Sequence, residues 1–221
     1  MRFQDNDFLL FTGDSVTDAG RGRPVGEGLG EGVGTGYVRA VDTLMNAFFP
    51  DLRLRISNTG TSGNTVRDLA ERWQSDVLDL KPDWLSVCIG INDVWRQYDM
   101  PNVTHRHVYP EEYRQTLEDL VCRTRQKVKG IVLMTPYYME PCKEDWMRAR
   151  MDEYGAIVRQ IAEKYDTGFV DLQAIFDNYL QHRHSSFLTW DRVHPNPTAS
   201  MLIAKAFLKL FDIEVDVSMH G

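Results

Sequence analysis

The sequence has few cysteines and no long apolar run, and these absences exclude several classes of protein. Its 221 residues include only three cysteines, Cys88, Cys122 and Cys142, without the spacing of a disulfide framework. We therefore expect free thiols, buried or half-buried, in a reducing cytoplasmic environment. The first residues lack the basic and apolar segments of a signal peptide. No stretch reaches the ~20 apolar residues of a membrane span.

Basic residues are not in excess. The chain has 25 lysines and arginines against 32 aspartates and glutamates, so its formal net charge is −7. Proteins that bind nucleic acids or anionic lipids do so through basic surfaces, so we expect neither as a partner. The usual phosphate-binding glycine patterns are also missing, although half of the 16 glycines lie in residues 20–36. That segment is open to two interpretations, a substrate loop beside Ser15 or an irregular surface connection.

Short apolar runs alternate with longer segments of helical spacing. The helical segments span residues 66–77, 113–128, 151–165 and 202–210, and the apolar runs are Phe8–Phe11, Leu54–Ile56, Trp84–Ile89, Ile131–Met134 and Phe169–Val170. This alternation indicates parallel β-α-β units. We predict one domain over residues 1–221, a three-layer α/β/α sandwich. Its central sheet is expected to have about five mostly parallel strands in a flavodoxin-like order.

A serine near one end and an Asp-x-x-His pair near the other supply the parts of a nucleophilic catalyst. Ser15 lies in the segment LLFTGDS, and Asp191 and His194 lie in WDRVHP. A serine hydroxyl is a weak nucleophile until a base takes its proton, and histidine needs a carboxylate to fix its tautomer. Residues three apart in a turn face each other, so Asp191 is predicted to hold one ring nitrogen while the other faces Ser15. Taken singly, a helix cap and a solvated turn are the ordinary roles of such residues.

Two further segments follow predicted strands, and functional sites in parallel sheets lie at the carboxyl ends of strands. Residues 58–65 read NTGTSGNT, and glycines there allow backbone N–H groups to point outward. Asn92 is expected on a tight turn, where its amide can donate to an oxyanion or bond its own backbone. Ser62 is a rival nucleophile, but Asn64 breaks the Gly-x-Ser-x-Gly pattern. Asn64 or Thr65 can also cap the next helix.

Aromatic residues flank two of these segments. Trp190 precedes Asp191, and Trp95 follows Asn92 by three residues. Because aromatic faces stack on sugar rings, we expect either tryptophan to bind carbohydrate, with core packing or an oligomer contact as the alternative.

Histidine pairs occur twice, as His105 and His107 and as His182 and His184. A metal site needs further ligands at matching depth, and neither pair has any evident in the sequence. We therefore expect solvated loop histidines and no metal.

The ordered set of segments resembles the SGNH hydrolases, the GDSL-type esterase family. This resemblance implies Ser15 as nucleophile, Asp191 and His194 as acid and base, and no cofactor. It also implies an oxyanion hole made by the Ser15 and Gly63 N–H groups and the Asn92 amide. The chain departs from the family's longer motif at Val16, where leucine is frequent; this is a packing position and casts little doubt on the match.

Within that family the sequence is most similar to bacterial acetylxylan esterases, over residues 13–18, 34–38, 62–69, 90–99 and 190–195. The similarity implies an intracellular esterase that deacetylates xylo-oligosaccharides through an acetyl-serine intermediate and assembles as a homo-octamer. Two alternatives remain open. One is an esterase, thioesterase or lysophospholipase acting on a non-sugar acyl ester, and the other is a non-catalytic carbohydrate- or flavin-binding module.

Overall fold

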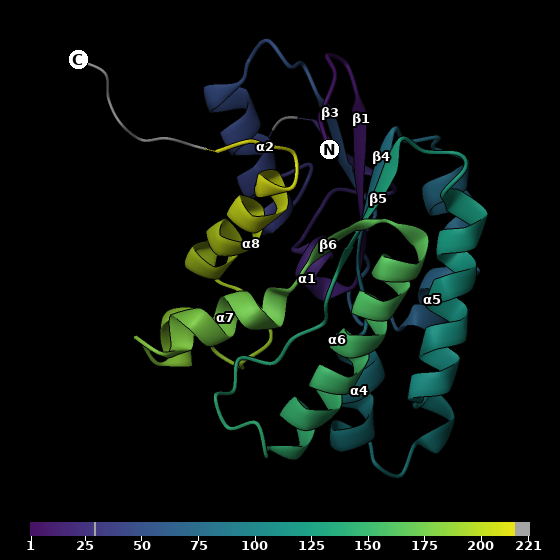
Figure 1. Cartoon of the computed structure of the whole chain (residues 1–221), viewed down its shortest axis with the longest axis vertical. Coiled ribbons are helices and arrows are strands. Elements are labelled where there is room, and N and C mark those ends of the chain that lie inside the picture. The colour runs from purple at the N-terminus through teal and green to yellow at the C-terminus, as the bar shows by residue number, and fades with distance from the viewer. Residues whose placement is uncertain (29, 215–221) are drawn as a thin grey trace.

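Six strands form one sheet in the computed structural model, which describes residues 1–28 and 30–214 (Figure 1). The strand order is β2-β3-β1-β4-β5-β6. The strands are β1 (Phe8–Gly13), β2 (Gly26–Glu27), β3 (Arg55–Asn58), β4 (Trp84–Cys88), β5 (Gly130–Met134) and β6 (Gly168–Val170). All neighbours pair in parallel except β2, which runs antiparallel to β3 at the sheet edge. The five parallel strands therefore have the expected flavodoxin-like order, and β2 is an unpredicted addition.

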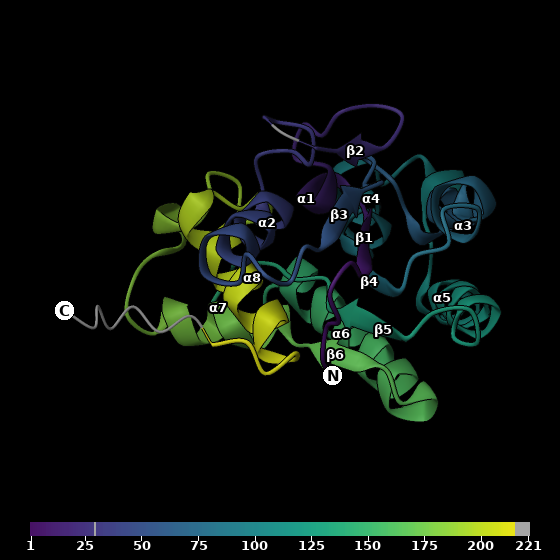
Figure 2. The same ribbon diagram turned by 90° about the horizontal axis from the view of Figure 1, so that it is seen from above.

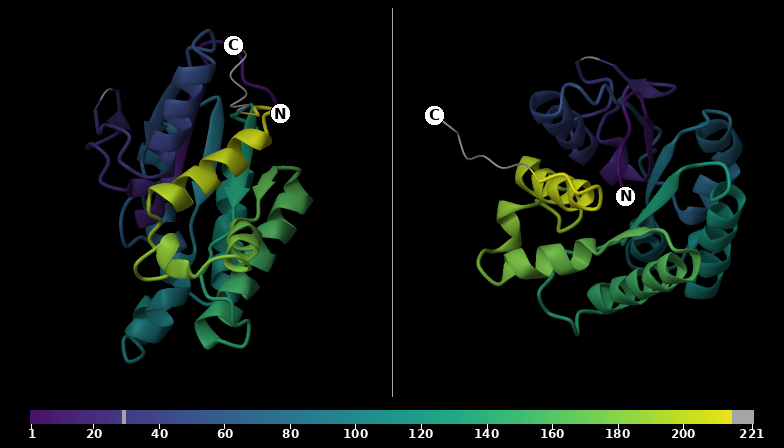
Figure 3. Two further views of the ribbon diagram at one scale, coloured as in Figure 1. Left: turned by 90° about the vertical axis from the view of Figure 1, so that its left-hand side faces the viewer. Right: turned by 45° about the horizontal axis from the view of Figure 1, so that its top comes forward.

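Helices cover both faces of this sheet. The longer ones are α2 (Tyr37–Phe48), α3 (Val66–Glu71), α4 (Ile91–Asp99), α5 (Pro110–Thr124), α6 (Trp146–Tyr165), α7 (Leu172–Leu180) and α8 (Pro197–Lys209). Figures 2 and 3 show α2, α7 and α8 on one side of the strands and α3, α5 and α6 on the other. The predicted three-layer α/β/α sandwich is confirmed.

Short helical turns complete the chain. The four-residue helix α1 (Ser15–Asp18) follows β1, and a π-helical turn (Gln74–Leu78) extends α3. Two 3-10 turns cover Thr104–Arg106 and Ser185–Phe187. None of the described helices is long and apolar enough to cross a membrane.

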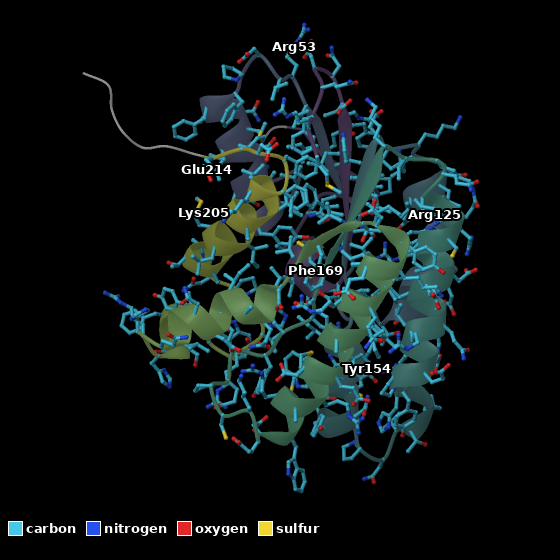
Figure 4. All side chains as sticks on the ribbon, viewed as in Figure 1. Arg53, Arg125, Tyr154, Phe169, Lys205 and Glu214 are labelled. Carbon is cyan, nitrogen blue, oxygen red and sulfur yellow. The ribbon has the colours of Figure 1, made fainter. Side chains whose placement is uncertain are left out.

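Buried side chains fill the space between the layers. Leu9, Leu10 and Phe11 of β1 have no exposed surface, because α2 and α8 cover one face of the strand and α3 and α5 the other. Tyr154, labelled in Figure 4, lies on α6, where its hydroxyl donates to the backbone oxygen of Val108 at 2.5 Å. This contact joins α6 to the segment before α5.

The carboxyl ends of β1 and β4 approach closely. A Cβ built on Gly13 would lie 2.0 Å from the backbone oxygen of Cys88, so only glycine fits at this point. Figure 1 shows α1 and α4 beginning just beyond these ends, at the edge where the sequence placed its candidate site.

The glycine-rich segment is tied to the same sheet. Strand β2 lies within it, and Glu27 pairs with Arg55 of β3 through two hydrogen bonds of 2.6 and 2.8 Å. Arg21 donates to the backbone oxygen of Gly60 at 2.7 Å. The segment is therefore anchored beside the loop that follows β3.

The three cysteines are free thiols, as expected, but their burial differs from the prediction. Cys88 is buried in β4, whereas Cys122 and Cys142 are exposed. Cys122 lies on the exposed face of α5 and is not one of the residues that this helix buries. The expectation of buried or half-buried thiols is wrong for these two.

Candidate active site

Ser15, His194 and Asp191 form a continuous hydrogen-bonded chain. The Ser15 Oγ lies 3.0 Å from His194 Nε2, and His194 Nδ1 lies 2.5 Å from Asp191 Oδ2. Ser15 is the first residue of α1, whose N-cap Asp14 accepts a hydrogen bond from the Val16 N–H at 3.0 Å. The strand end and the capped helix thus present the hydroxyl at the sheet edge.

A tight turn fixes Asp191 under the imidazole. Its Oδ1 accepts the backbone N–H groups of Val193 and His194 at 2.9 and 2.8 Å, and the Thr189 hydroxyl at 3.0 Å. Arg192 adopts a left-handed conformation with φ 68°, which lets the turn close. The aspartate and the histidine are therefore held by local backbone geometry.

The Asp191 carboxylate remains ionised at neutral pH. Burial acts to raise its pKa, but hydrogen bonds from the His194 ring and from the backbone N–H groups of His194 and Val193 outweigh it. The pKa is lowered below the usual value. An ionised Asp191 accepts a hydrogen bond from the Nδ1–H group of His194, which leaves Nε2 free to take a proton from Ser15.

Three donors face the position of a developing oxyanion in the predicted arrangement: the Ser15 N–H, the Gly63 N–H and the Asn92 amide. The two backbone N–H groups make no hydrogen bond to any described residue. Gly63 has φ +84°, a conformation that favours glycine, and it follows β3 on the same sheet edge. The donors therefore come from three separate segments.

Asn92 lies in the first turn of α4 and not on a tight turn, so that prediction is wrong. Strand β4 ends at Cys88, and Gly90, with φ +127°, is the N-cap residue of α4. The side chain is buried, with its Nδ2 donating to the Asn64 backbone oxygen at 3.0 Å and its Oδ1 accepting from Arg96 Nη2 at 2.9 Å. One of the two amide hydrogens is used, which leaves the other for a ligand.

Ser62, the rival nucleophile, has a different partner. Its hydroxyl and its backbone N–H both donate to Asp18 Oδ2, at 2.7 and 2.9 Å. No histidine contacts it among the residues that the structure describes. Thr65 caps α3 in a reciprocal capping box with Asp68, which is the cap role that the sequence left open between Asn64 and Thr65.

Arg72 connects these loops, and the sequence analysis missed it. It donates to the backbone oxygens of Gly13 and Thr59 at 2.9 and 2.7 Å and to the Asn64 side chain at 2.6 Å. Asp76 supplies its counter-charge at 2.9 Å. No sequence signal marks this role, because an arginine on the exposed face of a helix occurs next to apolar residues in the same pattern.

Two buried carboxyl groups lie behind the site. Burial raises the pKa of Asp14 to about 7 and that of Asp93 to about 8. Asp93 accepts the Val66 N–H at 2.9 and 3.2 Å, whereas Asp14 Oδ2 has no partner among the described residues. Both groups therefore hold a proton at a pH where an exposed aspartate has lost it.

Both tryptophan rings lie near the His194 ring. The Trp190 ring is 85% exposed and parallel to the imidazole, with centroids 6.0 Å apart and 7° between the planes. Trp95 is half-buried against the core, with its ring tilted by 51° at the same centroid distance. Trp190 therefore offers an open aromatic face at the site, and Trp95 is mainly a packing residue.

The histidine pairs do not form a metal site with other acidic, histidine or cysteine residues in the described chain. His107 is buried, and its ring bonds to the Tyr109 hydroxyl and the Met100 backbone oxygen at 3.3 and 3.0 Å. The expectation of a solvated side chain is wrong for His107, while His105, His182 and His184 are exposed.

Comparison with known proteins gives consistent matches. The model of the GDSL-like Lipase/Acylhydrolase family matches residues 11–200. An acetylxylan esterase of Geobacillus stearothermophilus is 51% identical over 214 residues, which is 97% of this chain and 98% of that protein. Its crystal structure, under the name Axe2, superposes with a TM-score of 0.95.

Other solved structures add to this result. Catalytic mutants S15A, D191A and H194A of Axe2 match with TM-scores of 0.95 over 97% of this chain and 98% of theirs. LAE5, an alpha/beta hydrolase from the metagenome of Lake Arreo in Spain, is 54% identical, with a TM-score of 0.93 over 95% of this chain and 97% of its own. The three mutated residues have the same types and numbers as the hydrogen-bonded chain described above.

Proposed function

The chain belongs to the GDSL-like lipase/acylhydrolase family, and we propose that it is a serine carbohydrate esterase that removes O-acetyl groups from xylo-oligosaccharides. The observation that carries the proposal is the chain of contacts from Asp191 through His194 to Ser15. The acetylxylan esterase that is 51% identical supports the choice of substrate. The sequence-based assignment to the family is confirmed by the family model.

Acylation begins with proton transfer from Ser15 Oγ to His194 Nε2. The oxygen attacks the acetyl carbonyl carbon, and the carbonyl oxygen becomes an oxyanion that accepts hydrogen bonds from the Ser15 and Gly63 N–H groups and the Asn92 amide. The bond from the carbonyl carbon to the sugar oxygen then breaks. His194 donates its proton to that oxygen, which leaves as a sugar hydroxyl.

Deacylation repeats these steps with water. His194 takes a proton from the water molecule, whose oxygen attacks the acetyl-serine carbonyl. The same three donors hold the second oxyanion. The bond to Ser15 Oγ breaks, His194 returns the proton to it, and acetate leaves. Asp191 stays ionised throughout and stabilises the imidazolium that forms in each half of the reaction.

The test compares the wild-type protein with Ser15→Ala. We expect acetate release from acetylated xylobiose, followed by NMR, to be nearly abolished by the substitution, with only a small residual rate. Thermal unfolding checks that the variant is folded. If the folded Ser15→Ala variant kept full activity, the assignment of Ser15 as the nucleophile would be wrong. Wild-type activity on acyl-CoA or long acyl esters, with none on the sugar, would instead establish a different acyl substrate.

A fluorophosphonate probe separates the esterase from a binding module. We expect the probe to label Ser15 in the wild-type protein and to fail with His194→Ala, because the hydroxyl is then not activated. No labelling of the wild-type protein, together with binding of unmodified xylobiose, would indicate a carbohydrate-binding module.

We also propose that the protein works in the cytoplasm as a homo-oligomer. The exposed thiols of Cys122 and Cys142 favour a reducing compartment. Large aromatic residues are also exposed at other points, including Trp146 at 77% and Phe187 at 52%, as is common for surfaces buried in assemblies. Light scattering on the purified protein measures the number of subunits, and cell fractionation tests the location.

A further inference from the structure

A hollow of about 250 Å³ lies beside the oxyanion position and is not used by the mechanism above. Residues 62–65 form one wall, and the side chains of Arg67, Asp68, Arg96 and Arg106 form the rest. Because Gly63 belongs to this wall, a group bound in the hollow lies next to the acetyl group under attack. The volume is close to the lower end of small-molecule pockets and suits a single sugar ring.

Two of the three arginines are already paired with carboxylates. Arg67 forms a bidentate pair with Glu112, with distances of 2.8 and 2.9 Å, and Arg96 pairs with Asp99. Arg106, on the 3-10 turn before α5, is exposed and has no carboxylate partner among the described residues. Its guanidinium donors are therefore available to a ligand.

The hollow also contains an acceptor. Asp68 Oδ2 is occupied by the N–H and hydroxyl groups of Thr65, both within 2.8 Å, while Oδ1 accepts no hydrogen bond from a described residue. A carboxylate in the wall repels an anionic ligand, and the guanidinium of Arg106 repels a cationic one. Donors and acceptors side by side fit a neutral ligand that carries several hydroxyl groups.

We propose that this hollow is a subsite for a neighbouring xylose unit of the oligosaccharide, with Arg106 and Asp68 hydrogen-bonded to its hydroxyl groups. The proposal rests on the esterase activity proposed above and names a second point of substrate contact. It predicts that the protein distinguishes acetylated oligosaccharides from acetate esters that carry no sugar.

The test measures KM for acetylated xylotriose and for 4-nitrophenyl acetate. We expect Arg106→Ala to raise KM for the trisaccharide by a factor about 10 times larger than the factor for the aryl ester. This is the effect of losing one hydrogen bond to a charged group. Arg150→Ala is the matched control, because Arg150 is an arginine on α6 that pairs with Glu153 and does not line the hollow. The control should leave the ratio of the two KM values unchanged.

Equal changes in KM on both substrates, or no change on the trisaccharide, would overturn the subsite. A wild-type protein that cleaves the aryl ester but not the acetylated trisaccharide would instead overturn the proposed function. As a second readout, calorimetry with Ser15→Ala should show that unacetylated xylotriose binds more weakly once Arg106 is also replaced. Because Arg106 is exposed, its removal should not disturb the fold.

A separate contact concerns the orientation of Asn92. An amide can be turned by 180° about its last bond, which exchanges its donor and acceptor. Arg96 donates to Oδ1 and the Asn64 carbonyl oxygen accepts from Nδ2, and both contacts oppose that rotation. After the rotation, the amide nitrogen would face the Arg96 donor, and the amide oxygen would face the Asn64 carbonyl oxygen. Arg96 is itself held by Asp99 and lies over the Trp95 ring at 5.4 Å.

We infer that Arg96 is a positioning residue that keeps the free N–H of Asn92 directed at the oxyanion; this also rests on the proposed function. We expect Arg96→Ala to lower kcat for 4-nitrophenyl acetate about 10-fold, less than the loss of a whole oxyanion donor. KM should change little. In an Asn92→Ala background the same substitution should have almost no further effect, because the two residues act through one contact.

Arg96→Lys and Arg150→Ala complete the set. Lysine keeps the charge without the planar fork, so it should restore only part of kcat. Arg150→Ala removes another arginine–carboxylate pair with the same three-residue spacing and should leave kcat unchanged. The assignment would be overturned if Arg96→Ala lowered kcat as much in the Asn92→Ala background as in the wild-type protein. It would also be overturned if Arg96→Ala raised KM and left kcat unchanged.

Discussion

Ser15 Oγ lies 3.0 Å from His194 Nε2, although the two residues are 179 positions apart in the chain. The hydroxyl comes from the first residue of α1, just after β1, and the imidazole comes from the turn before the last helix. The parallel order of the sheet brings them together, because sites form where several strands end on one edge.

Asp191→Asn should remove most of the activity without disturbing the turn. Asparagine can still accept the backbone N–H groups of Val193 and His194 through its oxygen, but its amide favours the wrong tautomer of the imidazole. We expect kcat to fall by about 10⁴. Steady-state kinetics checks this, and thermal unfolding confirms the fold. A loss smaller than tenfold would show that the carboxylate is not needed.

Gly60 and Gly63 should respond differently to replacement by alanine. A Cβ on Gly60 would lie 2.4 Å from the Asp18 backbone nitrogen, whereas a Cβ on Gly63 meets no atom within 4 Å. Gly63→Ala is opposed only by its φ of +84°, at a cost of about 1 kcal/mol. We expect Gly60→Ala to lower the melting temperature more, and Gly63→Ala to lower kcat in a protein that remains folded. The reverse ranking of melting temperatures would contradict this account.

Trp190→Ala tests the exposed aromatic face. Its ring is parallel to His194 and open to solvent, so we expect it to stack on the sugar. The substitution should raise KM for acetylated xylobiose about 10-fold, as for the loss of one aromatic contact. Light scattering should show an unchanged mass. A smaller mass with the same KM would make Trp190 an oligomer contact.

Stability should fall as the pH rises from about 4 to about 8. Burial raises the pKa of Asp93 to about 8 and that of Asp14 to about 7, while an unfolded aspartate titrates near ~3.9. Within this window the folded state holds protons that the unfolded chain has released. The free energy of unfolding therefore decreases, by up to about 1.4 kcal/mol per pH unit for each carboxyl.

Asp93→Asn isolates one of these two groups. Asparagine has nearly the same shape, can still accept the Val66 N–H, and carries no charge to bury. We expect the variant to lose part of the pH dependence, so that its stability relative to the wild-type protein increases from pH 5 to pH 8. Urea unfolding at three pH values measures this. Two parallel curves would show that Asp93 does not titrate in this range.

The sequence predicted the parallel strands well because their apolar runs are short, buried on both faces and separated by helical spacing. It also predicted the pairing of Asp191 with His194, which depends only on local geometry. Strand β2 was not predicted, since two residues carry no periodic pattern. Asn92 was expected on a turn because it closely follows a predicted strand, whereas Gly90 is the N-cap of α4 and Asn92 lies in the first turn of that helix.

The remaining features depend on contacts that only the folded chain creates. Arg72 is bound by backbone oxygens of two loops and by the Asn64 side chain, and none of these partners is marked in the sequence. The same holds for the contact of Arg96 with Asn92 and for the hollow beside Gly63. Hydrogen bonds to backbone oxygen depend on loop conformation, which residue type alone does not determine.

The turn from Thr189 to Pro195 contains both the acid and the base, whereas the nucleophile and the predicted oxyanion donors belong to the segments that follow β1, β3 and β4. The general base and its carboxylate are therefore held by the same short turn. Partial unfolding of this C-terminal segment would inactivate the protein while the central strands remain paired. Loss of turnover on heating should then precede loss of the circular dichroism signal, and cooling should restore both.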